Sequence, residues 1–297
     1  MTTLTQRPSK VPRPLNGEGL NGKRRARNTL NDLSAKEWIS ETVSVWTQRG
    51  LGKDHADAQI EREHPAPFSF QDVARLIRFF TKAGQTVLDP FVGVGSTLKA
   101  AALEGRAGIG IELSKKYAGL ATKRLKLEVP PGLLATAPQR IVTGDCRTVL
   151  PTIEQASIDL VVTSPPYWNI LHKRDHKAEQ EREAHGLDTR YSDDRCDLGN
   201  IASYDEFVDN LGGVFGMCHR LLKPKGHMCI VVGDFRHKAK YYMFHADLTA
   251  RLERHGFVPK GLQILYQRHK RVFPYGYPTS FVPNLHHQFI IIVQREP

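Results

Sequence analysis

The chain has 297 residues, of which 40% are hydrophobic and 25% charged, a composition that suits one large α/β domain or two small ones. Its net charge of +11 and pI near 9.5 favour a polyanionic partner, nucleic acid first. No apolar run approaches the roughly 18 residues of a membrane span, and the first residues lack the apolar centre of a signal peptide, so no membrane partner is expected. The 4 cysteines form no CxxC pair, which argues against a metal site or a disulfide framework and favours a reducing, cytoplasmic setting.

Residues 1–33 are rich in Pro, Gly, Asn and basic residues, including the cluster KRRAR at Lys23–Arg27. They show no apolar period, so we expect a flexible basic arm. Such an arm can contact phosphates or simply keep the chain soluble, and the sequence leaves both open. The folded domain is expected over residues 34–297, beginning at Ser34, a helix N-cap with Glu37 three residues on.

From residue 86 the chain alternates between strands and helices. Strands are expected at 86–91, 107–113, 140–145, 158–164 and 227–235, with helices from about 96, around 117–125, and at 204–222 and 244–255. Strands separated by helices imply right-handed crossovers and a parallel sheet. Two last strands, near 261–267 and 288–294, have no helix between them and should pair antiparallel at one edge. The prediction is an α/β fold with a mostly parallel, doubly wound sheet and an antiparallel C-terminal hairpin.

Two stretches do not fit this alternation. Residues 169–200 form a long polar insertion of mixed charge, and residues 271–284 are rich in aromatics and prolines. Connections of that length within one domain are usually functional or disordered. We therefore treat the insertion as a possible target-recognition or lid segment.

A glycine loop, DPFVGVGST, follows the first strand of the alternation. Gly93 and Gly95 permit a tight strand-to-helix turn and close approach of a ligand to the backbone. The loop lacks the lysine of a phosphate-binding P-loop, and Leu98 stands where a dinucleotide fold would have a third glycine. Asp89, which opens the loop, suits a ligand that carries an ammonium group.

Two further acids end the next two strands. Glu112 lies about twenty residues beyond the loop, where a carboxylate accepts hydrogen bonds from both ribose hydroxyls. Asp145, in TGDCR, is placed to accept from an adenine amino group. With Asp89, these acids occupy successive strand ends at the edge where open α/β sheets bind ligands. The predicted ligand is an adenosine with a cationic amino-acid tail.

The pairing of DPFVGVGST with TSPPYW (163–168) resembles the amino-methylating DNA methyltransferases of the N-4/N-6 type, which methylate exocyclic base amines from S-adenosylmethionine. HPAPFS, GIEL, GDCR, LLKPKG and HHQFIIIV are similar to that family's pattern too, so the resemblance covers about residues 36–295. It implies a Rossmann-like methyltransferase fold over residues 34–297, S-adenosylmethionine as cofactor, and Phe68 and Phe91 in the cofactor pocket.

Within that resemblance, SPPYW (164–168) has a chemical explanation. An exocyclic amine is a poor nucleophile because its lone pair is delocalised into the ring, and acceptors for its protons favour attack. The Ser164 side chain and the Pro165 carbonyl are the candidate acceptors, and Pro165 and Pro166 fix the backbone. Tyr167 offers a face for stacking, with Trp168 as part of the wall, and the base must leave the duplex to reach the methyl group.

The target base is the most open part of the prediction. Serine before the two prolines resembles the cytosine-N4 enzymes, whereas Asp or Asn resembles the adenine-N6 enzymes, so cytosine in double-stranded DNA is preferred and adenine is the alternative. Arg268, Lys270 and Arg271 are placed for phosphate contact, or form an ordinary solvated loop. The three other classes considered are an RNA or protein amine methyltransferase, an inactive DNA-binding module and a nicotinamide-dependent oxidoreductase. The expected setting is a bacterial or phage modification enzyme, solitary or paired with a restriction endonuclease.

Overall fold

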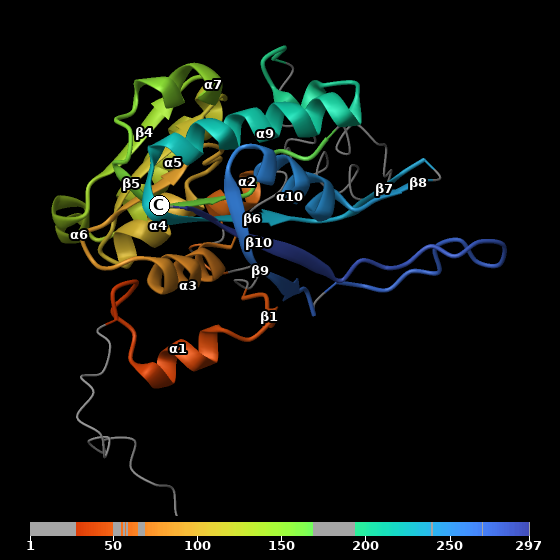
Figure 1. Ribbon diagram of the computed structural model, residues 1–297, viewed down its shortest axis with the longest axis horizontal. Helices are drawn as coiled ribbons and strands as arrows, with labels where there is room; N and C mark the ends of the chain where they lie inside the picture. The colour runs from red at the N-terminus through yellow and green to blue at the C-terminus, as the bar shows by residue number, and fades with distance from the viewer. Residues whose placement is uncertain are drawn as a thin grey trace, which may run out of the picture.

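An eight-stranded sheet with helices on both faces forms the body of the protein (Figure 1). The computed structural model describes residues 28–49, 55, 57, 59–64, 69–168, 194–238, 240–268 and 270–296. The order of the strands across the sheet is β1-β9-β10-β6-β5-β2-β3-β4. The strands are β1 (Val45–Thr47), β2 (Thr86–Asp89), β3 (Ala107–Glu112), β4 (Gln139–Thr143), β5 (Ile158–Thr163), β6 (Leu222–Val232), β9 (Phe257–Tyr266) and β10 (His287–Arg295).

Apolar spacing and capping residues predict the positions of most helices in the described residues. The helices are α1 (Ala35–Glu41), α2 (Gln59–Glu63), α3 (Phe70–Phe80), α4 (Ser96–Leu103), α5 (Lys115–Glu128), α6 (Pro131–Thr136), α7 (Cys146–Val149), α9 (Tyr204–Leu221) and α10 (Phe244–Arg254). At the start of α1, Ser34 and Glu37 form the predicted capping box. None of these helices is both long enough and apolar enough to cross a membrane.

The central strands are apolar on both faces because both faces are covered. In β6, Met228 and Ile230 face α9 and α10, whereas Cys229 and Val231 face α3 and α4. In β10, Ile291 faces α9 and α10 as Met228 and Ile230 do. Burial on both faces explains why these strands read as continuous apolar runs in the sequence.

The predicted fold class is confirmed. Strands β2 to β6 are parallel, and β10 pairs antiparallel with both β6 and β9. Two details differ from the prediction. The C-terminal hairpin is not at the edge, because β1 pairs parallel with β9 and takes that position. A separate small hairpin, β7 (Phe235–His237) with β8 (Lys240–Tyr242), follows β6 where only a connection was expected.

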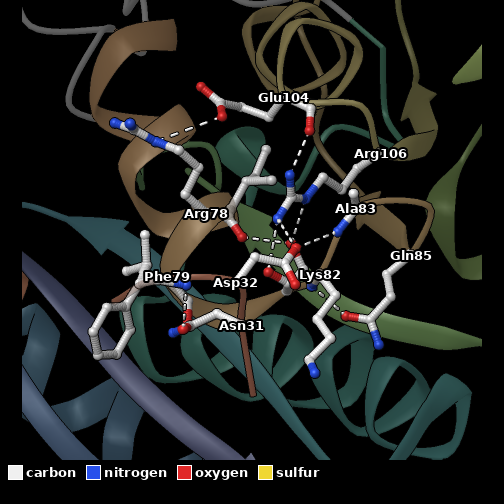
Figure 2. A network of polar contacts seen from close by, with 12 residues as sticks. Asn31, Asp32, Arg78, Phe79, Lys82, Ala83, Gln85, Glu104 and Arg106 are labelled. Carbon is white, nitrogen blue, oxygen red and sulfur yellow. Dashed lines mark hydrogen bonds and ion pairs between the residues drawn. The ribbon is translucent and has the colours of Figure 1, made fainter. Parts of the chain in front are cut away.

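The N-terminal segment 28–33, assigned to the basic arm by the sequence, is fastened to the fold (Figure 2). The buried Asn31 side chain donates to the Phe79 carbonyl at 2.6 Å. Asp32 accepts from the Ala83 backbone N–H at 2.9 Å and lies 3.7 Å from Arg106. These contacts hold the segment against the end of α3. The rest of the expected arm, residues 1–27, lies outside the described residues.

The order of the strands reverses between β2 and β5. β3 and β4 continue the sheet on one side of β2, whereas β5 and β6 continue it on the other. Loops that leave such a switch point diverge and open a crevice at the carboxyl ends of the strands. The glycine loop after β2 and the SPPYW segment after β5 both leave the sheet there.

Candidate active site

A cavity occupies the carboxyl edge of the sheet at this switch point. Four strand ends contribute to its wall, and the predicted site residues among its lining are Phe91, Gly93, Glu112, Asp145, Ser164 and Pro166. Residues expected to bind the cofactor therefore share one cavity with residues expected to hold the base. Phe68 lies outside the described residues.

Asp89 supports the glycine loop from beneath. Its Oδ1 accepts from the Phe91 N–H at 3.0 Å and from the Thr163 hydroxyl at 2.6 Å, and its Oδ2 accepts from the Thr97 hydroxyl at 2.5 Å. Burial raises the pKa of Asp89 to about 6, although the three hydrogen bonds act in the opposite direction. Asp89 is not among the residues that line the cavity. The structure thus gives it the role of joining the loop, β5 and α4, and direct contact with a cofactor stays a prediction.

The two loop glycines are required by their backbone conformation. Gly93 has φ +52° and Gly95 has φ +83°, in the left-handed region. A Cβ at Gly95 would lie 3.0 Å from the Cβ of Ala121, and one at Gly93 would lie 3.2 Å from the His64 ring. The loop therefore brings bare backbone to the cavity wall at Gly93, whereas Gly95 is not among the lining residues, and contact of either glycine with a ligand stays a prediction.

Glu112 is held in a fixed orientation by the loop that it faces. Its Oε2 accepts from the Gly93 N–H at 2.9 Å and its Oε1 from the Ser114 N–H at 2.8 Å. Burial raises the pKa of Glu112 to about 7, and the charges of Asp89 and Asp197 add to the increase. A carboxylate oxygen that accepts one hydrogen bond retains acceptor capacity for another. Each oxygen is thus able to accept from a ribose hydroxyl.

Asp145 is held by Arg147, a residue that the sequence prediction missed. The Arg147 side chain donates to both carboxylate oxygens, at 3.0 Å from Nε and 2.7 Å from an Nη, and its backbone N–H donates at 2.9 Å. Partial burial raises the pKa of Asp145, but the hydrogen bonds from Arg147 outweigh it, so the pKa lies below its ordinary value. Asp145 is therefore an ionised acceptor at neutral pH.

The SPPYW segment divides between the cavity and the core. Ser164 and Pro166 line the cavity, and Pro165 is buried. Within the described part of the chain, no hydrogen bond occupies the Ser164 hydroxyl, so it is available to a substrate. Its neighbour Thr163 is anchored on Asp89, which fixes where β5 ends.

Tyr167 and Trp168 are not among the residues that line the cavity. The Tyr167 hydroxyl accepts from Gln288 Nε2 at 2.9 Å, and burial raises the pKa of this phenol. Trp168 is 6% exposed, and its Nε1 donates to the Ile201 carbonyl at 2.8 Å. Its ring packs against Tyr204 and the β7–β8 hairpin. Trp168 is therefore a packing residue in this structure, and both its place in the wall of the base site and stacking by Tyr167 remain predictions.

The end of the polar insertion contributes to the cavity, which the sequence did not predict. Cys196, Asp197 and Leu198 line it, and the Cys196 carbonyl accepts from an Arg147 Nη at 2.9 Å. Residues 169–193 of the insertion lie outside the described residues. His64, in the stretch before α3, also lines the cavity. The sequence signal for residues 196–198 was that the insertion interrupts the alternation, and the signal for His64 was its place at the start of HPAPFS.

The three predicted phosphate-contact residues lie apart from the cavity lining. Arg268, Lys270 and Arg271 follow β9 and are exposed, and Lys270 Nζ donates to the Leu285 carbonyl at 3.4 Å. These three cations therefore do not belong to the cavity.

The chain belongs to the DNA methylase family of the N6/N4 type, whose family model matches residues 10–123 and 158–275. The type II methyltransferase M.BglI of Bacillus subtilis is 38% identical over 96 residues, 32% of this chain and 26% of that protein. The orphan methyltransferase M.BamHII of Bacillus amyloliquefaciens is 43% identical over 68 residues, 23% of this chain and 26% of that protein. The chain thus spans about a quarter of the length of these relatives.

Among solved structures, the chain is similar to TTHA0409 of Thermus thermophilus, a putative DNA modification methylase complexed with S-adenosyl-L-methionine. The identity is 28%, the match covers 52% of this chain and 54% of that one, and the TM-score is 0.35. S-adenosylmethionine is the methyl donor of the family to which the chain belongs. The cavity fits it: bare loop backbone at Gly93, a fixed acceptor at Glu112 and an ionised acceptor at Asp145.

Proposed function

We propose that the protein transfers a methyl group from S-adenosylmethionine to the N4 amine of cytosine in double-stranded DNA, with the target base turned out of the helix. The observation that carries this proposal is that Ser164 and Pro166 line the same cavity as Glu112 and Asp145. An amine held at Ser164 thereby faces the part of the cavity that suits a nucleoside cofactor. Serine at this position favours cytosine over adenine within the family's pattern.

The roles of the chain's residues follow from their contacts. S-adenosylmethionine supplies a methyl group on a positively charged sulfur. Glu112 accepts from its ribose hydroxyls and Asp145 from its adenine amine, which fix the position of the methyl group. The Ser164 hydroxyl would accept a hydrogen bond from the target amine, which would localise the lone pair of the amine nitrogen. The Pro165 carbonyl is the second acceptor proposed for the amine, and Pro165 and Pro166 restrict the backbone that holds both acceptors.

The base must leave the duplex, because an amine inside the stack cannot approach the sulfur-bound methyl group in line. Tyr167, held by Gln288, is the residue proposed to stack on it. Two of the relatives above are named as a type II and an orphan methyltransferase. We accordingly expect a modification enzyme of the cytoplasm, either paired with a restriction endonuclease or solitary.

The deciding experiment is to incubate the protein with unmethylated DNA and tritiated S-adenosylmethionine, digest the DNA to nucleosides and identify the labelled one by mass. Label in N4-methylcytosine is expected, and Ser164→Ala should lower the rate of labelling by about 100-fold or more, the usual loss for a hydrogen-bonding group that stabilises a transition state. Label in N6-methyladenine would keep the mechanism and replace the base. Label on RNA or protein alone would refute the DNA assignment.

A further inference from the structure

The connection between β9 and β10 is a long projection from the sheet (blue, at the right of Figure 1). Since β10 is antiparallel to both β6 and β9, β9 runs in the same direction as β6, β5 and β2. The connection therefore leaves the sheet at its carboxyl edge, the edge that holds the cavity. We call residues 268 and 270–285 the aromatic finger.

The described residues of the aromatic finger are organised by their own hydrogen bonds. Asn284 crosses between its two arms, accepting from the Phe273 N–H at 2.8 Å and donating to the Phe273 carbonyl at 2.8 Å. Gly276, at φ +76°, makes the tight turn at the tip, where a Cβ would lie 2.2 Å from the Ser280 carbonyl oxygen. The Ser280 N–H donates to the Gly276 carbonyl at 2.7 Å. The tip thus has a defined shape.

This shape displays aromatic side chains rather than burying them. Tyr277 is 83% exposed and Phe281 is 85% exposed, and Phe273 and Tyr275 are also open to solvent. Single exposed apolar side chains are common on proteins, but a cluster of them on one projection marks an interaction surface. The finger therefore needs a partner with flat or apolar faces.

The charge of the finger identifies the chemistry of that partner. From Gln267 to His286 the sequence contains neither Asp nor Glu, whereas Arg268, Lys270 and Arg271 stand at the start of the finger. Cations beside exposed aromatic rings, with no acid among them, match a polyanion whose interior offers flat faces. Nucleic acid has both properties: phosphates for the cations and base pairs for the rings.

We propose that the aromatic finger binds duplex DNA, with Arg268 and Arg271 on backbone phosphates and the rings of Tyr277 and Phe281 inserted between base pairs. The inference rests on the proposed function only in taking DNA as the substrate. Side chains wedged between base steps unstack and kink the duplex. Such a distortion lowers the cost of extruding a neighbouring base, which the reaction requires.

Hydrogen bonds connect the root of the finger to the SPPYW segment. The Gln267 backbone N–H donates to the His286 carbonyl at 2.7 Å. The Gln267 side chain donates through Nε2 to the Gln288 Oε1 at 3.3 Å. Gln288 in turn donates to the Tyr167 hydroxyl. The finger and the residue proposed to stack on the extruded base thus share one anchoring network, so DNA held by the finger has a fixed position relative to the base site.

The test compares three variants with the wild type in full-length protein. Tyr277→Ser/Phe281→Ser removes the tip rings, Arg268→Gln/Arg271→Gln removes two cations, and Leu127→Ser on α5 is a matched control at a 68% exposed apolar side chain. Binding of S-adenosylhomocysteine, measured by calorimetry, checks that each variant is folded. DNA binding is measured with a mixed-sequence duplex over a range of salt concentrations, and duplex distortion by relaxing a closed plasmid with topoisomerase in the presence of each protein.

We expect the tip variant to bind DNA about tenfold or more weakly, with an unchanged salt slope and no shift in plasmid topoisomers. The arginine variant should reduce the salt slope by about 2, because two phosphate contacts are lost. The Leu127→Ser control should behave as the wild type does.

Wild-type affinity and topoisomer shift in the folded tip variant would overturn the inference, even if methylation proceeds normally. Finger-dependent binding to phosphatidylglycerol vesicles without binding to DNA would overturn it as well, in favour of a membrane surface. Finger-dependent distortion of DNA without methyl transfer to any base would support the finger and refute the proposed function, so the two failures are distinguishable.

Discussion

At the scale of single residues, the carboxylate of Glu112 combines two properties that oppose each other. Its orientation is set by the backbone N–H groups of Gly93 and Ser114, yet its burial favours the neutral acid. A ribose hydroxyl is a hydrogen-bond donor and binds the ionised form better. The protonation state of Glu112 should therefore control the affinity for the cofactor near neutral pH.

The pH dependence of cofactor binding tests this coupling. With a pKa of about 7, the ionised fraction of Glu112 rises about tenfold between pH 6 and pH 8, so the affinity for S-adenosylmethionine should rise with pH by up to that factor. Calorimetric titrations at several pH values measure it. Glu112→Gln should bind S-adenosylmethionine about tenfold or more weakly at pH 8, because the glutamine NH2 group would face the N–H of Gly93 or of Ser114, a donor against a donor. The variant should also lose the pH dependence. An unchanged pH profile in that variant would rule out Glu112 as the titrating group.

At the scale of elements, the sequence predicts what depends on neighbouring residues. The apolar runs of β5 and β6, the helices between the strands and the acids at the ends of β3 and β4 all follow local rules, and the structure has them. Gly93 and Gly95 were also identifiable, because a strand followed by a tight turn into a helix requires them.

What the sequence could not predict depends on residues that are far apart. β1 has three residues, of which only Trp46 is buried, and it exists because β9, more than 200 positions later, offers an open edge. The sequence around Trp168 does not distinguish a ligand-facing ring from a core ring. In the structure the ring packs against Tyr204 and Phe235. Arg147 lies within the GDCR stretch, but its contact with the Cys196 carbonyl, 49 positions later, could not be predicted from that stretch.

The N-terminal segment shows the same limit and gives a prediction at this scale. Asn31 is 2% exposed, and its side chain bonds Asn28, Leu33 and the Phe79 carbonyl. Asn31→Ala should lower the free energy of unfolding by about 2 kcal/mol, because partly buried backbone groups of Leu33 and Phe79 lose their partners. Chemical denaturation measures the change.

The matched control is Asn210→Ala, which also removes a side-chain amide that donates to a helix carbonyl, that of Glu206, but through a solvent-exposed hydrogen bond. Asn210→Ala should change the free energy of unfolding little, since alanine favours a helix and water replaces the lost hydrogen bond. Equal losses of stability in the two variants would show that segment 28–33 does not contribute as the contacts indicate.

At the scale of the whole molecule, the carboxyl edge gathers parts of the chain that are distant in sequence. The glycine loop, the ends of β3, β4 and β5, and the end of the insertion enclose one cavity, and the aromatic finger leaves the same edge. Arg147 connects two of these parts, since it holds Asp145 and the Cys196 carbonyl together. Filling the cavity should therefore stabilise the end of the insertion as well as the strand ends.

Hydrogen exchange with and without S-adenosylhomocysteine tests this connection. In the wild type, cofactor should slow exchange both in the glycine loop and in residues 194–200, because both border the cavity. Arg147→Ala should keep the protection of the loop and lose most of it in residues 194–200, since the Arg147 side chain supplies the contact that joins that segment to Asp145. Arg140→Ala, at an exposed arginine of β4, is the matched control and should leave both regions protected. If protection of residues 194–200 survives in Arg147→Ala, the segment is held by the ligand directly, and the arginine serves Asp145 alone.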